Sequence, residues 1–403
     1  MRLTLEQAPW LQAPHAIAVL DALAAAGGEA RFVGGCVRNA ILGAPVDDLD
    51  LATPLTPGEV IAALEGAGLR AVPTGVEHGT VTAVSDHRPV EVTTLRRDVE
   101  TDGRRAVVAF TTDWAEDAAR RDFRLNALYA ERGGEVFDPV GGGVEDALAR
   151  RIIFVGDPET RIREDYLRIL RFFRFGAWYA REWDHAGLLA CAQLKDGLRG
   201  LSAERVGKEL LKLLAAPDPW AAVSWMGRTG VLPVAVPEMG RLDRFEAGAS
   251  LTDDAELRLS LLLKSDPEGV RRAADALRLS NVQKHRLLAA VETQPSVHLG
   301  MSPLQAFAAL YRIGAPAFRD RVIRGWADQR ERGGEARALL NLAEGWSRPR
   351  FPLNGDDLAE AGVPRGPALG RALRALEQAW IDSDFEEDRP ALLARLGDQL
   401  SGS

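Results

Sequence analysis

Cysteine is scarce in this sequence, since its 403 residues contain only Cys36 and Cys191. Two cysteines exclude a disulfide framework and a zinc site built from a cysteine cluster. Long apolar runs are also missing, because no segment reaches the roughly 18–20 residues that span a bilayer. The apolar stretch near the start is interrupted by Asp21 and lacks the basic flank that begins a signal peptide. By elimination, we expect a cytoplasmic protein.

Positive charge is in deficit as well, with a formal net charge of −8. Nucleic-acid binding needs Lys and Arg for its phosphate contacts, but the distribution of charge matters more than its sum. Between Arg312 and Arg350 there are nine arginines against five acids. A solvated helix face is the ordinary interpretation of such a stretch. If RNA is bound there, the candidate residues are Arg319, Arg321, Arg324, Arg348 and Arg350.

The chain is too long for one ordinary core, so two or more domains are expected. Strand patterns occur only in roughly the first 155 residues, and helical spacing of Leu and Ala dominates afterwards. These patterns predict an α+β fold, in which a small head with a mixed sheet precedes an all-helical remainder. The elements expected in the head are strands at 31–33 and 48–52, a helix at 37–42, a hairpin at 80–95, a loop at 96–105 and a helix from Asp113 through Tyr129.

A glycine pair and two aspartates carry the chemistry. Gly34-Gly35, followed by Arg38, lies between a strand and a helix, where backbone N–H groups can approach an anion. In Asp48-Leu49-Asp50 the alternation of a strand puts both carboxylates on one face, whereas Asp47 faces the other way. Like charges that close are unfavourable unless a cation lies between them, and Mg²⁺ is the cation that commonly joins carboxylates to a substrate phosphate.

Glu91 would project from a neighbouring strand beside the two aspartates. A third carboxylate suits a site for two metal ions roughly 3.5–4 Å apart. The alternative is an exposed strand glutamate with no role, and the sequence leaves both open.

Five segments, taken together, resemble the motifs of the class II tRNA nucleotidyltransferase and bacterial poly(A) polymerase family. They appear in the family's order and run from Gly34 to Asp50, Arg120 to Ala127, Asp138 to Gly142, Glu164 to Phe175 and Ser202 to Glu209. The resemblance implies a polymerase-β-like head at 1–155, a base-recognising neck at 156–215, a body at 216–350 and a tRNA-binding tail at 351–403. It also implies addition of C, C and A to the 3′ end of tRNA from CTP and ATP, with two Mg²⁺ ions.

The resemblance gives roles to single residues. Gly34, Gly35, Arg38 and Arg121 would hold the triphosphate, since the guanidinium fork matches phosphate oxygens. Asp122 and Asn126, expected four apart on one helix face, would reach the ribose. Asp165 and Arg168 would read the base, because cytosine and adenine each offer an amino donor beside a ring-nitrogen acceptor. Glu164 would orient Arg168, and the nucleotide site would also include Arg171 and Arg174.

Some positions depart from the family pattern. Asn39 stands where an acid is common, and Arg124 stands where a small hydroxyl residue is usual. Neither carries chemistry in the roles above. The six histidines form no His-Asp phosphohydrolase pattern, so we expect no accessory phosphatase domain of the kind some relatives carry.

Other functions stay open at this point. A poly(A) polymerase, or an enzyme adding only CC or only A, would share the head motifs. A tRNA-binding protein with an inactive head is the non-enzymatic alternative, although the intact Asp48, Asp50 and Arg121 speak against it. A small-molecule nucleotidyltransferase would lack the base-reading helix and the long helical remainder. The sequence does not indicate an oligomeric state.

Overall fold

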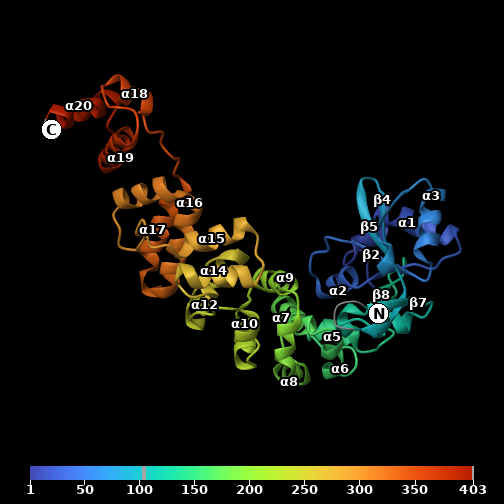
Figure 1. Cartoon of the computed structure of the whole chain (residues 1–403). Helices are drawn as coiled ribbons and strands as arrows, with labels where there is room; N and C mark the ends of the chain where they lie inside the picture. The colour runs from blue at the N-terminus through green and yellow to red at the C-terminus, as the bar shows by residue number, and fades with distance from the viewer. Residues whose placement is uncertain (102–105, 402–403) are drawn as a thin grey trace. The chain divides into compact units, whose positions relative to one another are not determined.

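The structure is a computed structural model that describes residues 1–101 and 106–401. Contacts divide the chain into two compact units, Met1–Ala235 and Val236–Ser403. Strands occur in the first unit and helices fill the second (Figure 1). Among the described residues, no helix is long and apolar enough to cross a membrane. The predicted boundaries after residues 155, 215 and 350 stay predictions.

A seven-stranded sheet forms the centre of the head. Its order is β3-β4-β5-β2-β1-β8-β9. Only β2 and β5 run parallel, and every other neighbouring pair is antiparallel, so the predicted mixed sheet is confirmed. The strands are β1 (Arg31–Val33), β2 (Asp50–Thr53), β3 (Arg70–Gly75), β4 (Thr80–Ser85), β5 (Arg88–Thr94), β8 (Tyr129–Ala130) and β9 (Val136–Phe137).

Alternating burial anchors this sheet to its helices. Val81 and Ala83 of β4 are fully buried, whereas the residues between them are half-buried. Helices α1 (Pro14–Ala25) and α3 (Pro57–Gly66) pack on each other and on β4. The short 3-10 helix η1 (Pro9–Gln12) leads into α1. Helix α2 (Gly35–Leu42) begins after β1 and Gly34. The remaining turn of this region is η2 (Val76–His78).

Two expected elements of the head are wrong. Instead of a loop at 96–105, strand β6 (Arg96–Thr101) pairs with β7 (Ala106–Phe110), and residues 102–105 lie outside the described part. The helix that starts after Asp113 ends early, since α4 covers only Trp114–Ala119. A 3-10 turn, η3 (Arg124–Asn126), follows, and Tyr129 already lies in β8. The Asp113 carboxylate caps helix α4 by accepting from the Ala115 amide at 2.8 Å, and the Glu116 carboxylate accepts from Thr111 Oγ1 at 2.5 Å.

Helices complete the first unit. An aromatic cluster ties them to the head, with ring centroids of Phe123 and Phe154 4.9 Å apart and those of Phe154 and Phe172 5.4 Å apart. The two cysteines are unpaired and buried, Cys36 in α2 and Cys191 in α8. The helices are α5 (Gly143–Ala149), α6 (Pro158–Glu164), α7 (Leu167–Tyr179), α8 (His185–Leu194), η4 (Lys195–Gly200), α9 (Ala203–Leu214), α10 (Trp220–Arg228) and α11 (Leu232–Ala235).

Two apolar clusters lie among the described residues at the C-terminal side of the second unit. One gathers around Leu310, Phe318 and Leu339, and the other around Tyr311, Leu376 and Trp380. Both draw on α16, whose helical path is interrupted at Gly314. The elements are α12 (Leu242–Gly248), α13 (Ala255–Leu262), α14 (Pro267–Ala276), α15 (Asn281–Val291), α16 (Pro303–Asp328), η5 (Arg330–Arg332), α17 (Gly333–Glu344), α18 (Gly355–Glu360), α19 (Pro367–Asp382) and α20 (Arg389–Ser401).

Candidate active site

A cavity of about 510 Å³ in the first unit brings most of the predicted site residues together. Ten of them line it: Gly34, Gly35, Arg38, Asp50, Arg121, Asp122, Asn126, Asp165, Arg168 and Arg171. Five residues that were not predicted for the site complete the lining: Arg96, Arg120, Leu167, Phe175 and Arg205. The wall is therefore rich in guanidinium groups, which suits a polyanionic ligand.

The glycine pair occupies the turn between β1 and α2. Gly34 adopts a φ of 69°, a left-handed conformation that favours glycine. A Cβ atom there would lie 3.4 Å from Nη1 of Arg121, so a side chain would press on that guanidinium. The turn leaves the N-terminus of α2 open toward the cavity, where backbone N–H groups attract an anion.

The carboxylates meet where β2 runs beside β5. Asp50 is the direct partner of Glu91 in the parallel register. Burial, together with the charges of Glu91 and Asp48, raises the pKa of Asp50 to about 6. Leu49 and Leu51 are buried as expected, but Ala52, two positions after Asp50, is buried as well, so the predicted alternation does not continue through β2. Such crowding of like charges fits a bound cation.

The two flanking carboxylates differ from expectation. Strand β2 begins only at Asp50, so Asp48 lies just before the strand. Asp48 lines a second cavity of about 450 Å³, together with Asp47, which was expected to face away. Glu91 is exposed and lines neither cavity. Within residues 1–101 and 106–401, no group of three or more His, Cys, Asp or Glu side chains is arranged to hold a metal ion. The side chains of Asp48, Asp50 and Glu91 would therefore have to move to bind metal at one shared site.

Arg121 is held by a buried carboxylate behind it. Nη2 of Arg121 lies 3.0 Å from Oδ2 of Asp117, whose side chain is 1% exposed. The same carboxylate receives Nη2 of Arg120 at 2.7 Å and the hydroxyl of Tyr129 at 2.6 Å. Burial would raise the pKa of Asp117, but the charges of Arg121 and Arg120 outweigh it and lower the pKa to about 2. The charged form of Asp117 therefore fixes the guanidinium of Arg121 at the cavity wall.

Asp122 and Asn126 are close, but not because they share a helix. They lie on either side of the start of η3, and Nδ2 of Asn126 donates to Oδ1 of Asp122 at 3.0 Å. Nε of Arg171 donates to Oδ2 of Asp122 at 2.7 Å, and Nη1 of Arg38 donates to Oδ1 of Asn126 at 2.6 Å. Asp122 thus orients two other groups of the cavity wall.

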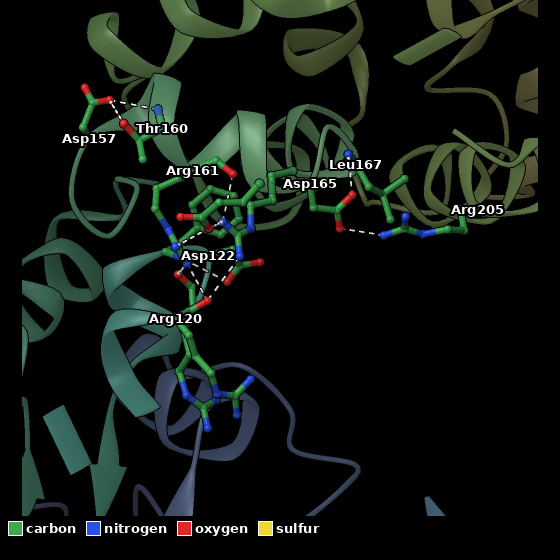
Figure 2. A network of polar contacts seen from close by, with 12 residues as sticks. Arg120, Asp122, Asp157, Thr160, Arg161, Asp165, Leu167 and Arg205 are labelled. Atoms are coloured by element: carbon green, nitrogen blue, oxygen red, sulfur yellow. Dashed lines mark hydrogen bonds and ion pairs between the residues drawn. The ribbon is translucent and has the colours of Figure 1, made fainter. Parts of the chain in front are cut away.

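The expected base-reading pair lies in the cavity, but each member has its own partner. Asp165 precedes α7 with an extended φ of −155°, so it does not share a helix face with Arg168, which lies in α7. Its Oδ2 accepts from Nη2 of Arg205 at 2.6 Å, and its Oδ1 accepts from the Leu167 amide at 3.1 Å (Figure 2). Arg168 pairs with Glu164 at 2.5 Å, as predicted. Arg205 was noted in the fifth motif but given no role, and its motif was the signal that pointed to it.

Three predicted arginines are engaged elsewhere. Arg174 lies outside the cavity lining and pairs with Glu209 at 2.7 Å. The RNA-binding predictions for Arg321 and Arg324 are wrong, because these residues are only 7% and 6% exposed. Arg321 donates to the Ala289 carbonyl at 2.6 Å, and Arg324 donates to a backbone carbonyl in α13. Both satisfy buried backbone oxygens that would otherwise lack partners.

Three of the five arginines predicted to bind RNA are exposed and remain available to a phosphate. They are Arg319, Arg348 and Arg350. The guanidinium of Arg348 lies 4.7 Å from the ring centroid of Tyr311, which orients it without burying it.

Comparisons with known proteins point to one family. Residues 30–153 match the poly A polymerase head domain, and residues 187–242 match the probable RNA and SrmB-binding site of polymerase A. The mitochondrial CCA tRNA nucleotidyltransferase 1 of Mus musculus is 33% identical, covering 91% of this chain and 86% of that protein. The CCA-adding enzyme of Lacticaseibacillus paracasei is 34% identical, covering 98% and 97%.

A solved structure gives the same result for the fold. The Bacillus stearothermophilus CCA-adding enzyme in complex with CTP aligns with a TM-score of 0.76 and 26% identity, covering 96% of this chain and 97% of that one. The Thermotoga maritima CCA-adding enzyme complexed with tRNA aligns with a TM-score of 0.69 over 98% of both chains, at 17% identity.

Proposed function

This chain belongs to the family of class II CCA-adding enzymes and poly(A) polymerases, and from that premise we propose that it is a CCA tRNA nucleotidyltransferase. It adds C, C and A to the 3′ end of tRNA from CTP and ATP and releases pyrophosphate. The observation that carries this proposal is a single cavity in which Asp50, the arginines suited to phosphate, and Asp165 with Arg168 all meet.

The triphosphate lies against the basic wall of the cavity. Arg38 and Arg121 donate to its oxygens, and the Gly35 amide supplies a further donor at the start of α2, whereas the Gly34 amide already donates to the Leu128 carbonyl. The 3′-hydroxyl oxygen of the tRNA attacks the α-phosphorus in line, the bond to the bridging oxygen breaks, and pyrophosphate leaves. These residues act by positioning and by stabilising charge.

Asp48 and Asp50 would hold Mg²⁺. The donor set fits, because both supply hard carboxylate oxygens, and burial together with the charges of Glu91 and Asp48 raises the pKa of Asp50 to about 6. When bound, the metal neutralises phosphate charge and makes the attacking hydroxyl more acidic. Glu91, as the register partner of Asp50, is the candidate third carboxylate for a second ion.

Asp165 and Arg168 select the base. Asp165 accepts from the exocyclic amino group of cytosine or adenine, and Arg168 donates to the adjacent ring nitrogen. Uracil and guanine present the reverse pattern, which leaves polar groups unpaired and weakens binding. Arg171 and Asn126, both tied to Asp122, suit the sugar.

Incorporation assays with defined tRNA ends test this function. The protein would receive Mg²⁺, each nucleotide singly and in mixture, and tRNA that ends before CC, before A, or after CCA. We expect stepwise incorporation of CTP and then ATP, and none on the complete end. An Asp50→Asn variant serves as the inactive control. A long A-tail would support a poly(A) polymerase. Arrest after CC, or addition of A alone, would support a partial enzyme, and no incorporation would support a tRNA-binding protein.

The cytoplasmic location stays a prediction from the sequence.

A further inference from the structure

We propose that Arg161 is a positioning residue that fixes the base-reading Arg168 relative to the triphosphate-binding Arg121, and that it thereby sets nucleotide selectivity. This inference rests on the proposed function. Arg161 lies in α6, is 8% exposed and is not part of the cavity lining. It therefore acts on the nucleotide only through other residues.

One terminal nitrogen of the Arg161 guanidinium holds the backbone at Arg120 and Arg121. Its Nη2 donates to the carbonyl of Arg120 at 2.5 Å and to the carbonyl of Arg121 at 2.8 Å. The side chain of Arg121 continues from this segment to the cavity wall, where Asp117 pairs with it. Two charge-assisted hydrogen bonds to successive carbonyls restrain the main chain from which Arg121 projects.

The other terminal nitrogen of the Arg161 guanidinium holds Arg168 through Glu164. Its Nη1 pairs with Oε2 of Glu164, and the same oxygen receives Nη1 of Arg168 at 2.5 Å. The ring of contacts then closes, because Arg168 Nη1 donates to the Arg161 carbonyl at 2.8 Å and Arg168 Nη2 donates to the Arg120 carbonyl at 3.2 Å. Figure 2 shows Arg161 and Arg120 among these polar contacts, with the pair of Asp165 and Arg205 to their right.

Nucleotide geometry explains why the contacts that hold Arg168 in place matter. CTP and UTP have the same sugar and phosphates, so the site distinguishes them only at the edge of the base. Uracil offers an acceptor where cytosine offers a donor. A guanidinium that could move by a small distance would satisfy that acceptor, and discrimination would fall. Arg168 cannot move in this way while Glu164 and two carbonyls engage it, and Arg161 orders both Glu164 and one of those carbonyls.

A general stabilising role for Arg161 makes a different prediction. Loss of packing would lower kcat/KM for CTP and UTP by the same factor, because both would suffer from a less ordered site. Loss of positioning would lower the ratio of the two values. The ratio of kcat/KM for CTP to kcat/KM for UTP therefore separates the two roles.

The test compares three variants of the full chain on tRNA that ends before CC. Arg161→Gln removes the fork, and Arg161→Lys keeps the charge but cannot reach both carbonyls and Glu164 together. The matched control is Arg163→Gln, from the same helix, where an exposed arginine pairs with Glu159 at 2.9 Å. We expect the ratio to fall on the order of 10-fold in Arg161→Gln, by less in Arg161→Lys, and not in Arg163→Gln.

Thermal unfolding of each variant accompanies the kinetics. If Arg161→Gln does not fold, the ratio measured for Arg161→Lys decides. An unchanged ratio in the folded variant, with both kcat/KM values lowered equally, would overturn the inference. Failure of the unmodified chain to incorporate CTP would instead overturn the proposed function, so the two failures are distinguishable.

Discussion

Asp165 is the residue on which the proposed nucleotide selectivity depends most directly. It lines the cavity, and Arg205 and the Leu167 amide hold its carboxylate toward the base position. Asp165→Ala should lower the preference for CTP and ATP over UTP and GTP on the order of 100-fold, because a site built to satisfy an amino donor loses its acceptor. Single-nucleotide primer extension measures the preference. Titration with Mn²⁺ should show metal binding unchanged, and an unaltered preference would remove Asp165 from base reading.

Asp117 is the residue on which the order of the phosphate-binding wall depends. Asp117→Asn leaves Arg120 and Arg121 facing a neutral group at a buried position, which should lower the free energy of unfolding by about 3–5 kcal/mol. Urea unfolding measures it. Asp196→Asn, which removes one partner of an exposed ion pair with Arg199, is the control and should cost less than about 1 kcal/mol.

The same carboxylate contributes a pH dependence. The charges of Arg121 and Arg120 outweigh burial and lower the pKa of Asp117 in the folded protein from its ordinary value of 3.8 to about 2, so the unfolded state takes up protons first. The stabilisation from Asp117 is therefore complete above about pH 5 and is lost as the pH falls toward 2. The difference in stability between the unmodified chain and Asp117→Asn should shrink over that range. A constant difference would contradict the role given to its charge.

At the residue scale, the sequence predicted which residues line the cavity better than it predicted which arginines are buried. Asp50 lines the same cavity as the glycine pair, as expected from their motif, although the burial of Ala52 breaks the two-residue alternation expected of the strand. Arg321 and Arg324 were misjudged, since a composition count does not reveal which backbone carbonyls a helix must satisfy. The role of Arg205 likewise depends on a contact with Asp165 across 40 positions, which no local pattern encodes.

At the scale of elements, Gly314 decides the path of α16. Its φ of 77° and ψ of 160° belong to a region that is essentially restricted to glycine. Gly314→Ala has room for a methyl group but not the conformation, and should destabilise the second unit by about 1–3 kcal/mol. Gly345→Ala, at a helix end with a φ of −85° and open space, should change stability by less than about 0.5 kcal/mol. Equal unfolding midpoints for the two variants would contradict this assignment.

Elements with strong local signals were predicted, and those decided by distant partners were not. The helix expected through Tyr129 ends early because Phe123 bridges to Phe154, and Tyr129 pairs with Phe137 in the sheet. The segment from Arg96 looked too polar for a strand, yet antiparallel pairing with Phe110 and Ala109 makes it one. Strand formation depends on cross-strand neighbours more than on intrinsic propensity.

At the scale of the whole molecule, a chain of net charge −8 has to hold a polyanion. Arg319, Arg348 and Arg350 are exposed in the second unit. Replacing all three by Gln should weaken tRNA binding and reduce the slope of log K against log salt by about 2–3, if each meets one phosphate. Filter binding at several salt concentrations measures the slope.

The control removes the same charge elsewhere. Arg132, Arg163 and Arg199 are more than half exposed in the first unit and lie outside the cavity, so their replacement should leave the slope unchanged. Equal slopes for the two triple variants would exclude a specific contribution of the three arginines in the second unit.

The two buried cysteines allow the opening of the first unit to be followed by the rate of their alkylation. Burial raises the pKa of Cys36 to about 12 and that of Cys191 well above its usual value, so neither thiol is ionised or accessible to an alkylating reagent. Both belong to the first unit, and the second unit contains no cysteine. The rate of alkylation therefore reports how often the catalytic unit opens, undisturbed by the helices that follow it. A slower rate with CTP present would give the nucleotide's binding free energy in the same experiment.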